Sequence, residues 1–287
     1  LMSRLSINNH DRDVAGYQYI YPVISRRSGG LSIGINFNTN NACNWRCVYC
    51  QVPDLKLGSA PDVDLDLLAA ELAEFLQDVL HGSFYERFEL EPEMRVIKDI
   101  AISGNGEPTS VKEFAKTIAL IVQVVGQANI ADAFQYVLIT NGSLIHKTDV
   151  QQGLKLLHEN KGQVWFKLDS ATEVARQAIN HSALNLNRQT ENLLSSESIC
   201  ATWLQTCMLN YAGKNNVGLV SNAEQEAYLA MLKKVIQQTT LQGVMLYSLA
   251  RPSLQPESSK ISRVTTEQIN DFANRIRALG LVVNVSL

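Results

Sequence analysis

The sequence predicts an α/β protein built as a partial (β/α)6 TIM-like barrel, a parallel sheet with outer helices. Three observations lead to this fold class. Short β-rich runs alternate with amphipathic helical patterns along most of the 287 residues, and this order is typical of a parallel sheet. Six such units occur without a doubly wound fingerprint, which favours an open barrel. Small, polar or charged residues follow each predicted strand, where the loops of a barrel hold its site.

The strands are predicted from runs rich in β-branched and aromatic residues that are bounded by turn formers. They cover residues 31–37, 99–103, 136–140, 164–168, 201–209 and 243–249, and a last run covers 281–287.

The segments between the strands have helical periodicity. After the first strand, apolar residues recur on one helical face and Gly82 is the expected stop. The segments 110–113, 148–151, 221–224 and 265–268 each have the pattern of a capping box at a helix start. The segment 82–99 is longer than a barrel connection needs, and we expect it to shape the substrate entrance.

Composition is that of a soluble globular protein. Apolar residues make up 46% of the chain and the net charge is −3, which argues against a large nucleic-acid surface because such surfaces are basic. No run is long enough to cross a bilayer, and the N-terminus lacks the apolar segment of a secretion signal. We therefore expect a cytoplasmic protein without a membrane partner. Residues 1–30 are predicted as an N-terminal extension, 31–250 as the barrel core, and 251–287 as a C-terminal helix and strand that pack on the barrel.

Three of the five cysteines lie in the loop after the first strand. Cys43, Cys47 and Cys50 have C-x3-C-x2-C spacing. In a reducing compartment, clustered cysteines indicate metal binding or redox chemistry rather than disulfides. A structural zinc ion takes four ligands and a cubane [4Fe–4S] cluster normally takes four cysteines. Three thiolates would leave one iron open to substrate or cofactor. The distant Cys200 and Cys207 are predicted to be buried thiols.

The cysteine loop, with Tyr49 before its last cysteine and a strand before the loop, resembles that of the radical S-adenosylmethionine (SAM) superfamily. The resemblance covers residues 31–249. The segments "CVYCQV", "SGNGEPT" and "YSLARPS" are similar to a branch that includes the wyosine-forming tRNA-modifying Fe–S oxidoreductases. Those enzymes hold a second cluster on cysteines upstream of this motif, whereas no cysteine precedes Cys43 here. Their two-cluster mechanism is therefore not implied.

The resemblance implies an iron–sulfur enzyme. Cys43, Cys47 and Cys50 would hold a [4Fe–4S] cluster whose open iron binds SAM. Reductive cleavage of SAM would then give a 5′-deoxyadenosyl radical that abstracts hydrogen from a substrate. An external electron donor of the flavodoxin or ferredoxin type is also implied. The substrate stays open between RNA such as tRNA, a protein and a small molecule. Two alternatives are a glycyl-radical activating enzyme and a non-catalytic metal-binding protein with a degenerate barrel.

The glycine-rich segment after the second strand supplies four candidate SAM contacts. It is similar to the Gly-Gly-Glu segment of the family, with Asn105 in place of the first glycine, followed by Gly106 and Glu107. Backbone groups and a carboxylate can accept hydrogen bonds from the SAM ammonium, and Gly104 and Gly106 permit close backbone approach. A plain strand-to-helix turn is the alternative interpretation.

The other candidate contacts follow later strands. Tyr49 is expected near the adenine, with core packing as the alternative. The remaining candidates for the ribose, the methionine end or the SAM carboxylate are Asn141, Lys167, Asp169, Ser170 and Arg251. Lys167 and Asp169 are two residues apart and so share one face of a strand. For Asn141 the structural alternative is a turn residue. For Lys167 and Asp169 it is an ion pair between the two side chains, and for Arg251 it is a surface arginine.

Overall fold

The structure, a computed structural model, describes residues 15–25, 29–130 and 134–287. Its main feature is an eight-stranded sheet in the order β1-β2-β5-β6-β7-β8-β10-β12. The strands are β1 (Ile20–Ser25), β2 (Gly30–Ile35), β5 (Ile97–Ile102), β6 (Gln135–Thr140), β7 (Gln163–Lys167), β8 (Thr202–Met208), β10 (Gly243–Ser248) and β12 (Val283–Ser286). β1 pairs antiparallel with β2, and all the other neighbours are parallel. The predicted partial barrel is therefore confirmed.

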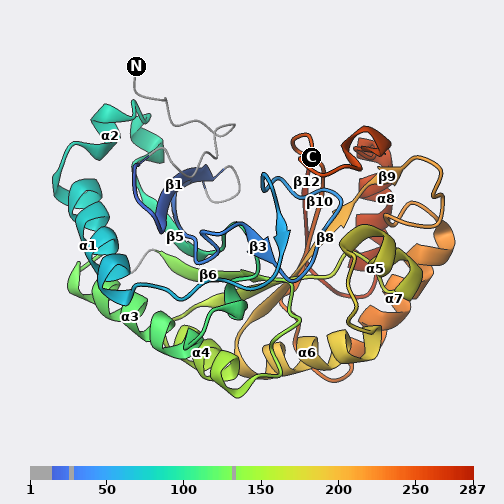
Figure 1. Ribbon diagram of the computed structural model, residues 1–287. Helices are drawn as coiled ribbons and strands as arrows, with labels where there is room; N and C mark the ends of the chain where they lie inside the picture. The colour runs from blue at the N-terminus through green and yellow to red at the C-terminus, as the bar shows by residue number, and fades with distance from the viewer. Residues whose placement is uncertain (1–14, 26–28, 131–133) are drawn as a thin grey trace.

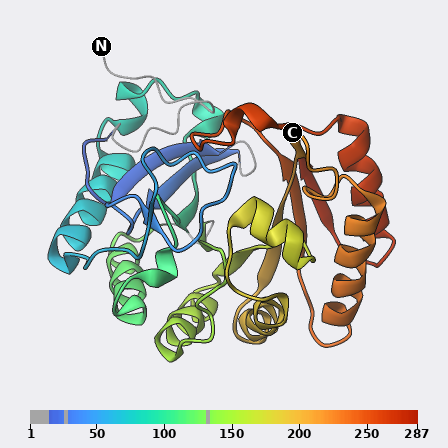
Figure 2. The same cartoon turned by 45° about the vertical axis from the view of Figure 1, so that its right-hand side comes forward.

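Helices cover the outer side of the curved sheet (Figures 1 and 2). They are α1 (Leu65–His81), α2 (Phe84–Arg87), α3 (Phe114–Gln127), α4 (Thr148–Glu159), α5 (Glu173–Asn180), α6 (Leu186–Ile199), α7 (Asn222–Ile236) and α8 (Thr266–Arg277). Helix α5 differs from the others because it lies inside the arc, beside the blue segment that contains β3 (Figure 1). No helix in the described part of the chain is both long and apolar enough to span a membrane.

A large apolar core lies between the sheet and the outer helices. Leu68, Leu72 and Phe75 of α1 are at most 1% exposed, which confirms the helical face read from the sequence. A second, smaller cluster joins Val48 of the cysteine loop to Ile179 of α5 and Cys207 of β8. This second cluster places α5 against the cysteine loop at the carboxyl end of the sheet.

Helix starts agree with the capping prediction in two of four cases. Thr265 and Gln268 form a full capping box at α8, and Ser221 caps α7. At 110–113 the prediction is wrong, and at 148–151 helix α4 begins at Thr148 as predicted but has no side-chain cap. Helix α3 begins at Phe114, and the carboxylate of Asp149 on α4 accepts its backbone N–H at 2.6 Å. A side chain from a neighbouring helix thus satisfies the donors that a local cap would otherwise satisfy.

The expectation for segment 82–99 is also wrong. A helix that follows a strand returns the chain to the amino ends of the strands, so the connection from α1 to β5 lies at the edge of the sheet away from the carboxyl-end loops. Phe84 of this segment packs on Phe75, with ring centroids 5.1 Å apart. The end of the segment lies at the amino end of β2, where the Val96 carbonyl accepts the Leu31 N–H at 2.8 Å.

The N-terminal strand β1 was not predicted. Its Tyr21 ring occupies the space above Gly34 of β2, where an added Cβ would lie 2.1 Å from the ring. The Tyr21 hydroxyl hydrogen-bonds to Ser103 Oγ at 2.8 Å. β1 and β12 thus join the same sheet as the barrel strands, while the division at residues 30 and 250 stays a prediction.

Candidate functional site

The cysteine loop between β2 and α1 is closed on itself by a short parallel pair. β3 (Ala42–Cys43) pairs with β4 (Lys56–Leu57). Backbone bonds of 2.9 Å from Lys56 N–H to the Asn41 carbonyl and 3.0 Å from Gly58 N–H to the Cys43 carbonyl complete the closure. The loop therefore has its own hydrogen-bonded frame.

Two other segments hold the loop in place. The carbonyl of Ile179, near the end of α5, accepts the Val48 N–H at 2.8 Å. On the other side, Ser253 Oγ donates to the Val48 carbonyl at 2.7 Å, and the Leu254 N–H donates to the Cys50 carbonyl at 3.0 Å. The loop is thus anchored to α5 and to the connection after β10.

The three thiols lie in this frame, each half-buried. The Trp45 N–H points at Cys43 Sγ at 3.5 Å, and the Asn180 amide donates to Cys47 Sγ at 3.3 Å. Burial raises the pKa of Cys47 to about 12 and also raises that of Cys43. Lys167 opposes the rise at Cys47 but does not outweigh burial, and bound iron would replace the protons of these thiols.

These surroundings fit an iron–sulfur cluster. Thiolates are soft ligands, and N–H groups that point at sulfur are typical outer contacts of such a site. Among the residues that the structure describes, no three His, Cys, Asp or Glu side chains gather around a single metal-ion position. A cubane cluster does not need such a position, because each of its cysteines binds a different iron and the three sulfurs do not meet at one ion.

Glu107 lies at the centre of the loops after β5 and β6. Its Oε1 accepts from the hydroxyls of Thr109 and Thr140, each at 2.6 Å, and from the Thr109 N–H at 3.1 Å. Its Oε2 accepts the Asn141 N–H at 2.7 Å. Burial raises the pKa of Glu107, and these donors oppose the rise. The carboxylate thus joins two loops, and a SAM contact through it stays a prediction.

The two glycines of the same segment are required by packing within the protein. A Cβ on Gly104 would lie 2.1 Å from Asn36 Oδ1, and one on Gly106 would lie 2.0 Å from the Ala42 carbonyl oxygen. The close backbone approach expected from the sequence is therefore to the chain itself. Asn105 follows the same pattern because its side chain donates to Asn41 Oδ1 at 2.7 Å.

The loop after β6 also contacts the cysteine loop. Asn44, directly after Cys43, accepts from the Asn141 amide and donates to Ser143 Oγ, each at 2.8 Å. Asn141 is 5% exposed. The structure therefore brings Asn141 to the cysteine loop, as the barrel prediction requires.

Tyr49, Lys167 and Asp169 meet on the inner side of the sheet. The Tyr49 hydroxyl donates to Asp169 Oδ2 at 2.5 Å, and Lys167 Nζ lies 3.3 Å from the same hydroxyl and 2.9 Å from that of Tyr247. Burial opposes the charge of Lys167, but Tyr247 and Asp169 outweigh it and the pKa of Lys167 is raised. Instead of a direct ion pair, the two charged groups share the Tyr49 hydroxyl.

Asp169 also reaches the cysteine loop through α5. Its Oδ2 accepts the Asn180 amide at 2.7 Å, and the same amide contacts Cys47 Sγ. Ser170 instead faces α7, where its Oγ donates to Glu224 Oε1 at 3.2 Å. Arg251 follows β10 and is half-buried. Contacts from these residues to SAM stay predictions.

Sequence reasoning missed several residues of this site. Asn36 bonds to the glycine-rich segment, Asn180 and Ser253 bond to the cysteine loop, and Asn44 bonds from the cysteine loop to the loop after β6. A run of asparagines around the first cysteine was the one local signal, since short amides often bond to nearby backbone. Asn180 and Ser253 are far from the loop in sequence and gave no signal.

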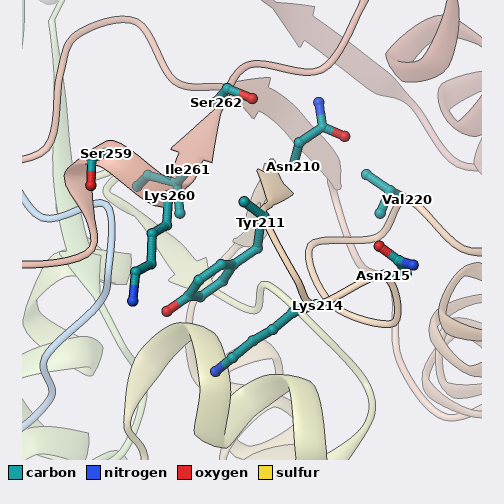
Figure 3. Close-up of a pocket in the computed structure, with 10 residues that line it drawn as sticks. Asn210, Tyr211, Lys214, Asn215, Val220, Ser259, Lys260, Ile261 and Ser262 are labelled. Atoms are coloured by element: carbon teal, nitrogen blue, oxygen red, sulfur yellow. The ribbon is translucent and has the colours of Figure 1, made fainter.

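Two pockets border the site at the carboxyl ends of β8 and β10. The smaller, of about 370 Å³, lies over β9 (Asn210–Tyr211) and β11 (Ile261–Ser262). Figure 3 shows Tyr211, Lys214 and Lys260 with their polar ends on the same side of this pair. The larger, of about 680 Å³, also includes Tyr211 and Lys214, together with Glu257. Arg46 of the cysteine loop pairs with Glu257 at 2.7 and 2.8 Å, so the larger pocket adjoins the cysteine loop.

Comparison with known sequences gives distant relatives. No protein-family model matches the chain. A UPF0026 protein of Helicobacter pylori is 24% identical over 237 residues, which is 81% of this chain and 66% of that protein. A "GTPase Obg" of Brachyspira hyodysenteriae is 31% identical over 133 residues, which is 46% of this chain and 17% of that protein. The chain thus spans less than two thirds of these relatives' lengths.

Comparison with solved structures decides the fold. TYW1 with a lysine–pyruvate adduct bound superposes with a TM-score of 0.50 and 15% identity, over 86% of this chain and 73% of that one. A spore photoproduct lyase mutant with bound AdoMet and dinucleoside spore photoproduct gives 0.53 and 9%, over 91% and 77%. Both belong to the radical SAM superfamily. The chain shares the fold of these two radical SAM proteins.

In the radical SAM fold, the loops at the carboxyl ends of the parallel strands face one rim. The hydrogen bonds described above connect the loops after β2, β5, β6, β7 and β10 at that rim. The sequence prediction that these loops converge is therefore confirmed.

Proposed function

We propose that this chain is a radical SAM enzyme. The observation that supports it best is the position of the three-cysteine loop. The loop lies at the rim of a radical SAM fold, and hydrogen bonds connect it to four other rim loops. Cys43, Cys47 and Cys50 hold the [4Fe–4S] cluster. When bound, the cluster and SAM supply a 5′-deoxyadenosyl radical that abstracts hydrogen from the substrate.

The residues of the chain position these groups. Asn180 and the Trp45 N–H orient the sulfurs of Cys47 and Cys43. Tyr49, Lys167 and Asp169 form one hydrogen-bonded wall beside the cysteine loop, with hydroxyl, ammonium and carboxylate groups that suit the polar parts of SAM. Glu107 fixes the loops after β5 and β6, and in this proposal backbone groups of 104–106 and Asn141 would contact the cofactor.

The substrate binds at the two pockets beside Tyr211. Residues that line the smaller pocket include Lys214 and Lys260 and no Asp or Glu. This charge favours a substrate that has an anionic group. A small external protein of the flavodoxin or ferredoxin type would supply the electron.

The test is production of 5′-deoxyadenosine. The protein is purified without oxygen, its cluster is reconstituted, and dithionite and SAM are added before analysis by mass spectrometry. The Cys47→Ala variant is the negative control, and Cys200→Ala, which removes a buried cysteine away from the loop, is the matched control. Product from wild type and Cys200→Ala but not from Cys47→Ala is expected. Stoichiometric zinc without iron would contradict the proposal.

A further inference from the structure

Arg176 of α5 faces the cysteine loop. It is 2% exposed, and its guanidinium carbon lies 5.8 Å from the centroid of the Trp45 ring. Residues four apart on a helix lie on the same face, and the residue four positions later is Asn180, which contacts Cys47 Sγ. Arg176 is therefore within one helical turn of a cysteine contact.

The guanidinium is incompletely paired. Its Nη2 donates to the Leu184 carbonyl at 2.8 Å, and its Nε is buried without a hydrogen-bond partner. Within the described ranges, no ion pair joins Arg176 to a carboxylate. Both oxygens of the nearby Asp169 already accept hydrogen bonds from other groups.

This arrangement is unfavourable for the protein alone. Arginine stays charged in proteins, and a buried charge destabilises the fold unless an opposite charge is close. Burial lowers the pKa of Arg176 although Glu173 and Asp169 act in the opposite direction. A negatively charged group that is present only when a cofactor is bound would offset the destabilisation caused by the buried charge of Arg176.

We propose that Arg176 is the buried counter-charge of the cluster on Cys43, Cys47 and Cys50, and that it raises the cluster's reduction potential. The inference rests on the proposed function. Three thiolates give the cluster a net negative charge, and one-electron reduction adds another. A fixed cation close by stabilises the reduced cluster more than the oxidised one. Two other cations are less suited to this role. Glu257 already neutralises Arg46, and Lys167, which acts on Cys47, is already bonded to Tyr49 and Tyr247 beside Asp169.

The experiment compares wild type with Arg176→Met, which keeps much of the volume and removes the charge. Arg176→Gln is a second neutral variant, Arg176→Lys keeps the charge, and Arg188→Met removes an exposed arginine of α6 as the matched control. Each protein is reconstituted without oxygen, its iron is counted, and its cluster is titrated with dithionite and followed by electron paramagnetic resonance.

We expect equal iron in all five proteins. At a fixed potential, the ratio of reduced to oxidised cluster should fall about tenfold in Arg176→Met and Arg176→Gln, a shift of about 59 mV for a one-electron couple. Arg176→Lys and Arg188→Met should stay near wild type. A second readout needs no iron: apoprotein of Arg176→Met should resist urea at least as well as wild-type apoprotein.

The outcomes separate the two proposals. If wild type binds iron, and if Arg176→Met and Arg176→Gln keep the wild-type reduction potential, the role of Arg176 is overturned and the proposed function stays intact. An unchanged potential with weaker SAM binding would assign the guanidinium to the SAM carboxylate instead. A less stable or unfolded Arg176→Met apoprotein would show that the guanidinium is structural. Absence of iron from wild type would overturn the proposed function first and this inference with it.

Discussion

The backbone N–H of Asn141 donates to Oε2 of Glu107 at 2.7 Å, and this bond joins the loop after β6 to the loop after β5. Glu107 is 2% exposed and accepts from three further donors. A residue that the sequence marks as a cofactor contact is thus also a link between two rim loops.

We expect Glu107→Ala to lower the free energy of unfolding by about 3 kcal/mol, because it leaves buried donors without acceptors. Urea unfolding of the apoprotein measures this change. Glu159→Ala, at an exposed position near the end of α4, should change stability by less than about 0.5 kcal/mol. Equal midpoints for wild type and Glu107→Ala would refute the linking role.

Gly106→Ala should strongly disrupt the rim. The added methyl group would lie 2.0 Å from the Ala42 carbonyl oxygen, and backbone on both sides would have to move. We expect a loss of more than about 2 kcal/mol and weaker iron binding. Gly126→Ala is the matched control, since a Cβ there meets no atom within 4 Å. In helix α3 this change should stabilise the protein by about 0.5–1 kcal/mol. Similar melting temperatures for the two variants would contradict the packing argument.

Iron binding should separate the five cysteines into two groups. After reconstitution, Cys43→Ser, Cys47→Ser and Cys50→Ser should each lose most of the iron and the visible absorption of the cluster, because two thiolates hold it poorly. Cys200→Ser and Cys207→Ser remove buried thiols and should keep the iron per folded protein. Full iron content in any of the first three would exclude that cysteine as a ligand.

Glu224 should make stability depend on pH near neutrality. Burial raises its pKa from 4.5 to about 7, while hydrogen bonds from Leu219 and Ser170 limit the rise. A raised folded-state pKa means that the stabilisation is complete below about pH 4.5 and is lost as the pH rises through about 7. Relative to Glu224→Gln, wild type should lose up to about 3 kcal/mol between pH 5 and pH 8.

Urea unfolding of both proteins at half-unit pH steps measures this difference. Other titrating groups are present in both proteins and cancel in the comparison. Parallel pH profiles for wild type and Glu224→Gln would show that Glu224 titrates with an ordinary pKa.

The strands could be predicted because buried parallel strands leave a local signal. Residues 136–140 and β6 (Gln135–Thr140) differ by one position, and the other barrel strands agree to within two residues at most ends. Strand β1 was missed because Pro22 weakens its strand signal and because its contact at Ser103 lies elsewhere in the chain. The start of α3 was misplaced for the same reason, since its cap, Asp149, belongs to another helix.

The candidate site was predictable in outline. The order of strands and loops indicated which residues meet at the rim, and the cysteine spacing indicated where a cluster would bind. The contacts that orient these groups could not be predicted, because Asn180 and Cys47 are 133 residues apart and only the folded chain brings them together. The same holds for Ser253 and the Val48 carbonyl, which are 205 residues apart.

The β3–β4 pair and the anchors on α5 and Ser253 hold the cysteine loop through bonds that involve protein atoms alone. Oxygen destroys iron–sulfur clusters, and a loop whose conformation depended on bound iron would lose that conformation whenever its cluster was lost. Here the loop's frame would outlast such damage. Under the proposed function, a chain that has lost a damaged cluster could therefore accept a new one without refolding.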